Sequence, residues 1–123
     1  MKYKIKRNGS DTILGILNYD ELKKEYTIDI LPIEITDAPF LFSIFMKKGI
    51  YHINPYWSKR WVNARIIPIE RQNIGEILRV NHMKYYDDHQ LLVKNQGRCC
   101  QDELYIESLW AEYIYYIDKT IIL

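Results

Sequence analysis

Alternating apolar and polar positions at the start of the chain predict a β-hairpin. The segment 3–7, YKIKR, alternates and ends at Asn8 and Gly9, a dipeptide that strongly favours a tight turn between strands. The run 12–19, TILGILNY, is rich in branched aliphatic residues and predicts the second strand. Gly15 lies inside this run, which is typical of a β-bulge.

A third strand follows in the segment YTIDILPI. Tyr26, Ile28 and Ile30 share one face of this predicted strand, because side chains alternate along extended backbone. Pro32 ends the strand or places it at a sheet edge. The first third of the chain therefore predicts a small antiparallel sheet.

The pattern of residues 37–53, DAPFLFSIFMKKGIYHI, is compatible with either a helix or a strand. Asp37 is a suitable helix cap, but Phe40, Phe42 and Ile44 also alternate as they would in a strand. Short apolar runs do not distinguish the two by period, so both alternatives stay open here.

The next segment has a well-defined helix start. Asn54 is a favourable N-cap, and Pro55 occupies the first helical position, where its missing N–H costs nothing. Pro68 is expected to stop this helix. Trp57 and Trp61 lie four residues apart and therefore on the same side of it.

Two further helices and a strand are predicted downstream. The first helix runs from about Glu70 to Val80, and the second, DHQLLVKN, is capped by Asp87 or Asp88. The predicted apolar faces of these helices are Ile74, Ile77 and Leu78 in the first and Leu91 and Leu92 in the second. Leu104 and Ile106 belong to a predicted strand in the segment CQDELYIESL. For residues 109–123 the spacing of apolar residues favours a helix, although the run YIYYI has strand propensity.

Composition places these elements in one domain. The chain has 123 residues, of which 48% are apolar, so it can bury a core of ordinary domain size. We expect a single α+β domain over residues 1–123, with a small antiparallel sheet packed against two to four short helices. The apolar runs are too short to span a bilayer and no signal peptide follows the cationic N-terminus, so we expect a cytoplasmic protein.

Motifs for catalysis and for metal binding are sparse. The five glycines are scattered rather than gathered in a phosphate loop. Cys99 and Cys100 are adjacent, which predicts two free thiols, and their spacing from His82 and His89 matches no standard zinc site. A Cys99–His89 nucleophile pair and acid–base chemistry at Asp87-Asp88-His89 are weaker alternatives, because an Asp pair at a helix start is usually a cap. We therefore predict no catalytic residues, no metal and no cofactor.

The segment YWSKRWVNAR is the strongest candidate for a binding surface. A single helix cannot bury aromatic residues on every side, and Trp with Arg is the combination that protein interfaces concentrate at their centres. The predicted partner-binding residues are Trp57, Arg60, Trp61 and Arg65, with one tryptophan in the core and the arginines at the rim.

Nucleic-acid binding is the alternative for the same segment. Aromatic and cationic side chains together can stack bases and hold phosphates, and Lys2, Lys4, Lys6 and Arg7 predict a basic first strand. The net charge is only +1, however, which argues against direct nucleic-acid binding.

Two runs resemble the N-terminal subdomain of the HipA-type serine/threonine kinase family. WVNARIIPIERQNIGEIL is similar to a family segment with two Phe, a polar pair, Leu-Leu-Pro-Glu and an Arg-containing helix. LLVKNQGRCCQDELYI resembles a family run of Leu-Leu, a spacer and Gly-Arg-Asp-Cys-Ala-Gly-Ala-Leu, with Gly97, Arg98, Cys100 and Leu104 in matching places. The opening hairpin is also similar, so the resemblance covers residues 3–107. The departures from the family pattern are Ile69 for Glu, Cys99 for Asp, and Gln101-Asp102 for Ala-Gly.

The resemblance implies a regulatory role. A free-standing copy of this subdomain resembles the small partner in split HipA-type toxin–antitoxin systems, in which the kinase is a separate chain. It implies an antitoxin-like regulator or subunit of a HipA-like kinase, with a DNA-binding antitoxin as a second candidate partner. The alternative function is that of a nucleic-acid-binding or mobile-element accessory domain.

Overall fold

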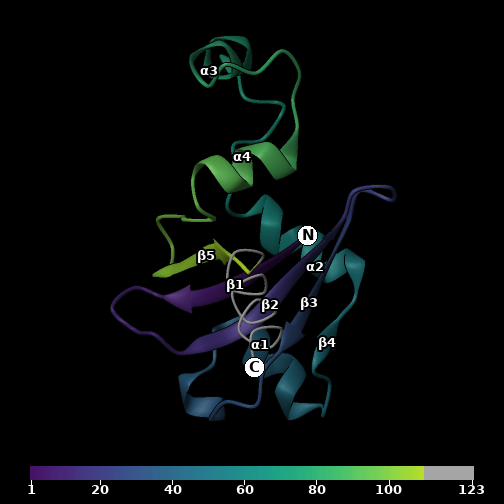
Figure 1. The fold of residues 1–123 in the computed structure, drawn as a ribbon, viewed down its shortest axis with the longest axis vertical. Coiled ribbons are helices and arrows are strands. Elements are labelled where there is room, and N and C mark those ends of the chain that lie inside the picture. Colours follow the sequence, from purple (N-terminus) through teal and green to yellow (C-terminus); the bar gives the residue numbers. More distant parts are fainter. Residues whose placement is uncertain (110–123) are drawn as a thin grey trace, which may run out of the picture.

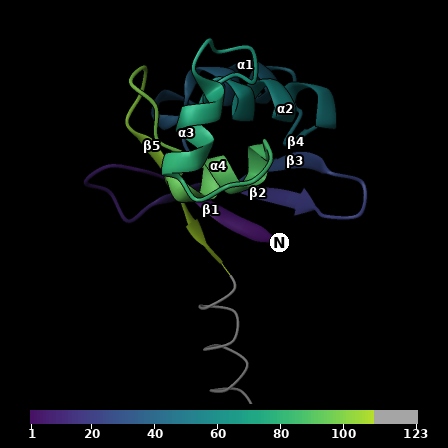
Figure 2. The ribbon, with the colours of Figure 1, turned by 90° about the horizontal axis from the view of Figure 1, so that it is seen from above.

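The computed structural model describes residues 1–109, which form an antiparallel sheet with helices on one face (Figures 1 and 2). The strands, in sheet order, are β4 (His52–Ile53), β3 (Glu25–Ile30), β2 (Ile13–Asp20), β1 (Lys2–Arg7) and β5 (Leu104–Ser108). All neighbouring strands are antiparallel. The small α+β fold predicted from the sequence is therefore confirmed.

The helices follow one another on the same side of the sheet (Figure 2). They are η1 (Ile35–Asp37), α1 (Phe40–Lys47), α2 (Pro55–Asn63), α3 (Ile74–Val80) and α4 (Asp88–Lys94). Figure 1 shows α3 beyond α4, away from the sheet. The core lies between the sheet and the helices, where Leu17 and Ile28 of the sheet and Phe42, Val62 and Leu92 of the helices are fully buried.

The predicted hairpin and its bulge are confirmed. Gly9, in the β1–β2 turn, has a φ of +77°, a conformation that glycine adopts without steric cost. Ile5 pairs with Gly15 while Lys6 pairs with Ile13, so the extra residue lies beside Gly15. A Cβ on Gly15 would lie 2.9 Å from the carbonyl oxygen of Asp29, which explains the glycine.

Residues 37–53 contain both of the alternatives left open by their pattern. The first part is the helix α1, and the last two residues form the edge strand β4. Gly49, with a φ of +73°, reverses the chain between them. Phe42 is the buried residue of α1, and Leu41, Phe45 and Met46 pack half-buried against the core. Phe40 and Ile44 remain exposed.

Three helix boundaries or faces differ from the prediction. Helix α2 ends at Asn63, before Pro68, and helix α3 begins at Ile74 rather than near Glu70. Ile74, Ile77 and Leu78 were expected in the core, but α3 has no buried residue, because it lies beyond α4 and away from the sheet (Figure 1). All three are half-buried, and Leu78 packs against the edge of the core.

The other predicted elements are confirmed. Asp87 is the N-cap of α4 and accepts a hydrogen bond from the Gln90 N–H at 3.1 Å. Leu91 and Leu92 are buried, and β5 begins at Leu104 as expected. The helix predicted within residues 109–123 falls, apart from Leu109, outside the described residues.

Candidate protein-docking site

The two tryptophans of α2 lie in different environments. The Asn54 side chain caps the helix by accepting from the Trp57 N–H at 3.0 Å, which fixes the first turn. Trp61 is 7% exposed and belongs to the core, whereas Trp57 is 40% exposed and meets Phe45 edge to face at 6.3 Å. The expected division into one core and one surface tryptophan is confirmed.

Arg60 lies on the exposed side of α2, among aromatic rings. Its guanidinium carbon is 5.7 Å from the centroid of the Tyr56 ring and 5.5 Å from that of Trp57. One of its amino groups also donates to the Tyr56 hydroxyl at 3.2 Å. These cation–π contacts hold a positive charge at the surface next to the exposed tryptophan.

Arg65 was expected at the rim of this surface, and that position is wrong. The residue is 5% exposed, with its guanidinium carbon 4.0 Å from the Trp61 ring centroid. It donates to the Gly97 carbonyl at 2.8 Å and forms a two-bonded ion pair with Asp102. A partner 37 residues away along the chain decides its position, and the local pattern does not contain that information.

The ion pair controls the protonation of Asp102. Burial raises the pKa of this carboxyl, but the hydrogen bonds from Arg65 and the backbone N–H of Leu104 outweigh that effect, so the pKa lies below its ordinary value. Asp102 therefore stays ionised and neutralises Arg65 at neutral pH. The pair fastens the loop after α4 to the end of α2.

A groove of about 510 Å³ brings the predicted residues together with two other segments. Trp57, Arg60, Trp61 and Arg65 all line it. The start of α1 and the loop before β5 complete its walls. The groove therefore combines an aromatic wall, an exposed cation and a floor held by a buried ion pair.

Phe40 is the principal site residue that the sequence interpretation missed. It lines the groove and is 82% exposed, the second most exposed large apolar side chain in residues 1–109. Arg7, at the end of β1, also lines it. One local feature points to Phe40: the run FLFSIFM is apolar on every side of a short helix, and a sheet can cover only one side.

The basic first strand does not present an open cationic surface. Lys4 is 2% exposed and lies 3.2 Å from the Glu107 carboxylate, and Lys6 lies 3.1 Å from the same group. Hydrogen bonds from the two lysines lower the pKa of Glu107, with Lys6 contributing the larger effect. These two lysines are therefore paired within the molecule, which weakens the nucleic-acid alternative for this strand.

The cluster at the start of α4 is structural. Asp88 accepts from the Tyr26 hydroxyl at 3.0 Å and pairs with Lys59. His89 shares a 2.6 Å hydrogen bond with the Tyr3 hydroxyl and stacks on Tyr19 at 4.0 Å. Burial lowers the pKa of His89, which therefore is mainly neutral at pH 7. These contacts join the helix to the sheet.

Both cysteines are free thiols. Cys99 and His89, the alternative nucleophile pair, are bonded to different partners. The Cys99 sulfur lies 3.7 Å from an oxygen of Asp102, whereas His89 is bonded to Tyr3. Within residues 1–109, no group of three or more His, Cys, Asp or Glu side chains is placed to hold a metal ion.

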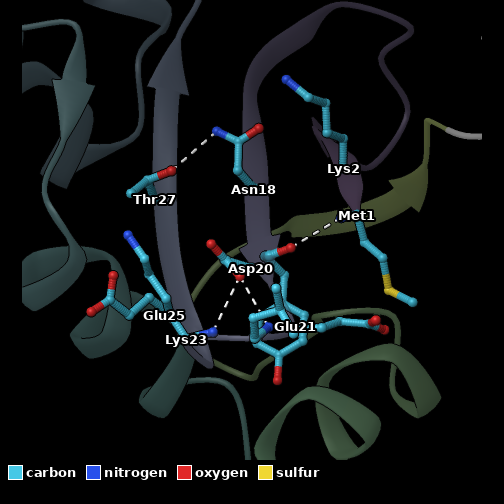
Figure 3. A pocket seen from close by; sticks show the side chains of 10 residues that line it. Met1, Lys2, Asn18, Asp20, Glu21, Lys23, Glu25 and Thr27 are labelled. Atoms are coloured by element: carbon cyan, nitrogen blue, oxygen red, sulfur yellow. Dashed lines mark hydrogen bonds between the residues drawn. The ribbon is translucent and has the colours of Figure 1, made fainter.

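A second hollow, of about 640 Å³, lies beside the β2–β3 turn and the N-terminus (Figure 3). Its lining mixes both charges. The Asp20 carboxylate is used locally, since it accepts from the backbone N–H groups of Leu22 and Lys23. The Met1 amine is likewise occupied, because it donates to the Tyr19 carbonyl at 3.0 Å. The Asp20 carboxylate thus stabilises the turn, and the Met1 amine is bonded to strand β2.

Comparison of the chain with protein-family models, with curated proteins and with solved structures found no match. The kinase-subdomain resemblance therefore stays a prediction. Across the described part of the chain, every helix is too short or too polar to cross a lipid bilayer.

Proposed function

We propose that this protein is a non-catalytic docking protein for a separate HipA-like serine/threonine kinase chain, which it serves as an antitoxin-like regulator or as a subunit. The observation that carries the proposal is the division of α2. Trp61 completes the core, while Trp57 remains exposed at a groove beside Phe40 and Arg60. Stability alone does not account for two large exposed aromatic side chains at one groove.

The composition of this surface is that of a protein-binding site. Interfaces concentrate Trp, Tyr and Arg in central clusters surrounded by a rim that excludes water. Tyr56, Trp57 and Arg60 form such a cluster on one turn of α2, and Phe40 extends it across the groove. The sequence resemblance supplies the class of partner, a HipA-like kinase, with a DNA-binding antitoxin as a second candidate partner.

The pairing of cations gives less support to the nucleic-acid alternative. Lys4, Lys6, Lys59 and Arg65 each have a carboxylate partner within the molecule. Neutralised cations release few counterions from a phosphate backbone, which is the main source of affinity for nucleic acid. Binding of a protein partner depends instead on exposed apolar surface, which the pairing of these cations does not reduce.

The proposal is tested by co-expressing the full chain with a HipA-like kinase chain from the same genome and measuring the affinity of the purified pair. Trp57→Ala should weaken binding at least about thirtyfold, because a central interface tryptophan contributes about 2 kcal/mol or more. Tyr85→Ala is the matched control, since this ring is 81% exposed and lies outside the groove.

Two results would contradict the proposal. One is a kinase chain that the wild-type protein does not bind. The other is a Trp57→Ala variant that binds as tightly as the Tyr85→Ala control. Retention of single-stranded DNA with a steep dependence on salt would favour the nucleic-acid function instead.

A further inference from the structure

We infer that the groove recognises a partner segment in which an apolar anchor side chain is followed closely by a carboxylate, and that Arg60 is the residue that selects the carboxylate. The inference rests on the proposed docking function and adds the chemistry of the occupant. It follows from the distribution of apolar area and of unpaired charge around one groove.

The apolar part of the groove is already formed in the free protein. Phe40 comes from the start of α1, and Trp57 comes from the first turn of α2. Ala64, whose side chain is a single methyl group, lines the same groove. An aromatic or aliphatic anchor placed there would remove both exposed rings from water, which is the main favourable contribution to such contacts.

The charges lining the groove are unequal in availability. Arg65 is neutralised by Asp102, and its one donor atom that is unpaired within the described residues, Nε, is buried, so its charge is not available to a ligand. Arg60 makes a hydrogen bond to Tyr56, and within residues 1–109 no carboxylate pairs with it. Arg7 donates to a backbone carbonyl, that of Asp37, at 3.1 Å and likewise has no carboxylate partner among the described residues.

The acidic residues of the groove do not balance these two arginines. Asp102 is engaged by Arg65, which leaves Glu103 as the acidic lining residue without an ion pair in the described part of the chain. The groove is thus lined by two guanidinium groups and one carboxylate that have no ion pair among the described residues. The groove favours a negatively charged segment, because complementary charge steers association and selects the partner.

Arg60 is prepared for this task by its aromatic neighbours. Contacts with Tyr56 and Trp57 restrict the side chain before any partner arrives, so less conformational entropy is lost on binding. A planar guanidinium binds a carboxylate through two parallel hydrogen bonds, which lysine does not reproduce. Because Arg60 and Trp57 share one helical turn, an anchor on the tryptophan brings a neighbouring carboxylate to the arginine.

The inference is tested by selecting binders to the full chain from a random-peptide display library. Selected peptides should carry Asp or Glu next to an aromatic or aliphatic residue. The best peptide is then synthesised in two forms, with the carboxylate or with the corresponding amide. The amide form should bind at least about tenfold more weakly, as expected for loss of a charge-assisted hydrogen-bonded pair.

A double-mutant cycle assigns this loss to one residue. Arg60→Gln should lower the affinity for the carboxylate peptide by a similar factor of about ten and leave the affinity for the amide peptide nearly unchanged. Arg79→Gln makes the same change of charge on α3, outside the groove, and should have no effect. Trp57→Ala should lower the affinity for both peptides.

Several outcomes would overturn the inference. One is a library that yields no binders, and another is a set of binders without acidic residues. A third is an Arg60→Gln variant whose affinities for the two peptides equal those of the wild type. Self-association that Phe40→Ser abolishes would identify a second copy as the occupant instead. The kinase-binding experiment distinguishes this inference from the proposed function. If Trp57→Ala weakens kinase binding and Arg60→Gln does not, the docking function stands and the carboxylate preference is rejected. If the protein binds carboxylate peptides selectively but binds no kinase, the carboxylate preference stands and the kinase-docking function is rejected.

Discussion

Helix α2 carries two tryptophan–arginine pairs whose composition is the same and whose surroundings are opposite. Trp61 and Arg65 are buried, stacked at 4.0 Å, and tied to Asp102. Trp57 and Arg60 remain exposed and contact aromatic rings, and within residues 1–109 no carboxylate pairs with Arg60. The same residue types therefore become part of the fold where a distant carboxylate reaches them, and stay at the surface where none of the described carboxylates does.

The largest expected effect separates the two tryptophans. Trp61→Ala should lower the free energy of unfolding by about 3–5 kcal/mol, because it opens a cavity in the core and removes the surface on which Arg65 stacks. Trp57→Ala should change it by less than about 1 kcal/mol, since the side chain is partly in water already. Urea denaturation followed by circular dichroism measures both. Equal losses would mean that the exposed pair is also structural.

The next effect concerns the two arginines. Asp102→Asn should cost about 2 kcal/mol, since it leaves the buried Arg65 charge without a neutralising partner. Arg60→Gln should change stability by less than about 0.5 kcal/mol, because this cation is exposed. The same denaturation experiment applies, with Glu103→Gln as a control for a neighbouring carboxylate that has no ion pair in the described residues. A loss for Glu103→Gln as large as for Asp102→Asn would contradict the assignment.

A smaller effect is expected at the start of the helix. Asn54→Ala should cost about 1 kcal/mol, because the Trp57 N–H loses its capping acceptor. Asn54→Asp retains the acceptor and should be nearly neutral. If the alanine variant also weakens partner binding while Asn54→Asp does not, the first turn must be ordered for Trp57 to bind. Unchanged stability in Asn54→Ala would show that the cap contributes little.

The smallest effect is a change in pH dependence. The folded-state pKa of Asp102 is lowered, so its contribution is complete above about pH 4, the ordinary Asp value, and is lost as pH falls through the lower folded-state pKa. The stability of the wild type should therefore fall more steeply in this acidic window than that of Asp102→Asn. Parallel curves in denaturation at a series of pH values would remove Asp102 from the acid response.

The elements of the fold were largely predictable because their causes are local. Turn residues at Asn8 and Gly9, alternation in the first strands, and the caps at Asn54 and Asp87 are properties of a few neighbouring residues. The start of α3 was misplaced, since nothing nearby marks it and its Asn73 cap position makes no side-chain hydrogen bond. The surface position predicted for Arg65 was wrong for a different reason, because its partner is distant in sequence.

Local sequence features were sufficient to predict the α+β class, the capped helix α2 and the concentration of tryptophan and arginine on it. Tertiary contacts determine which tryptophan enters the core, that Asp102 neutralises Arg65, and that Phe40 and Trp57 line one groove. The two sets of features differ in the distance along the sequence over which their causes act. Propensity, capping and periodicity act over one or two turns, whereas burial and ion pairing depend on which distant segments the folded chain brings together.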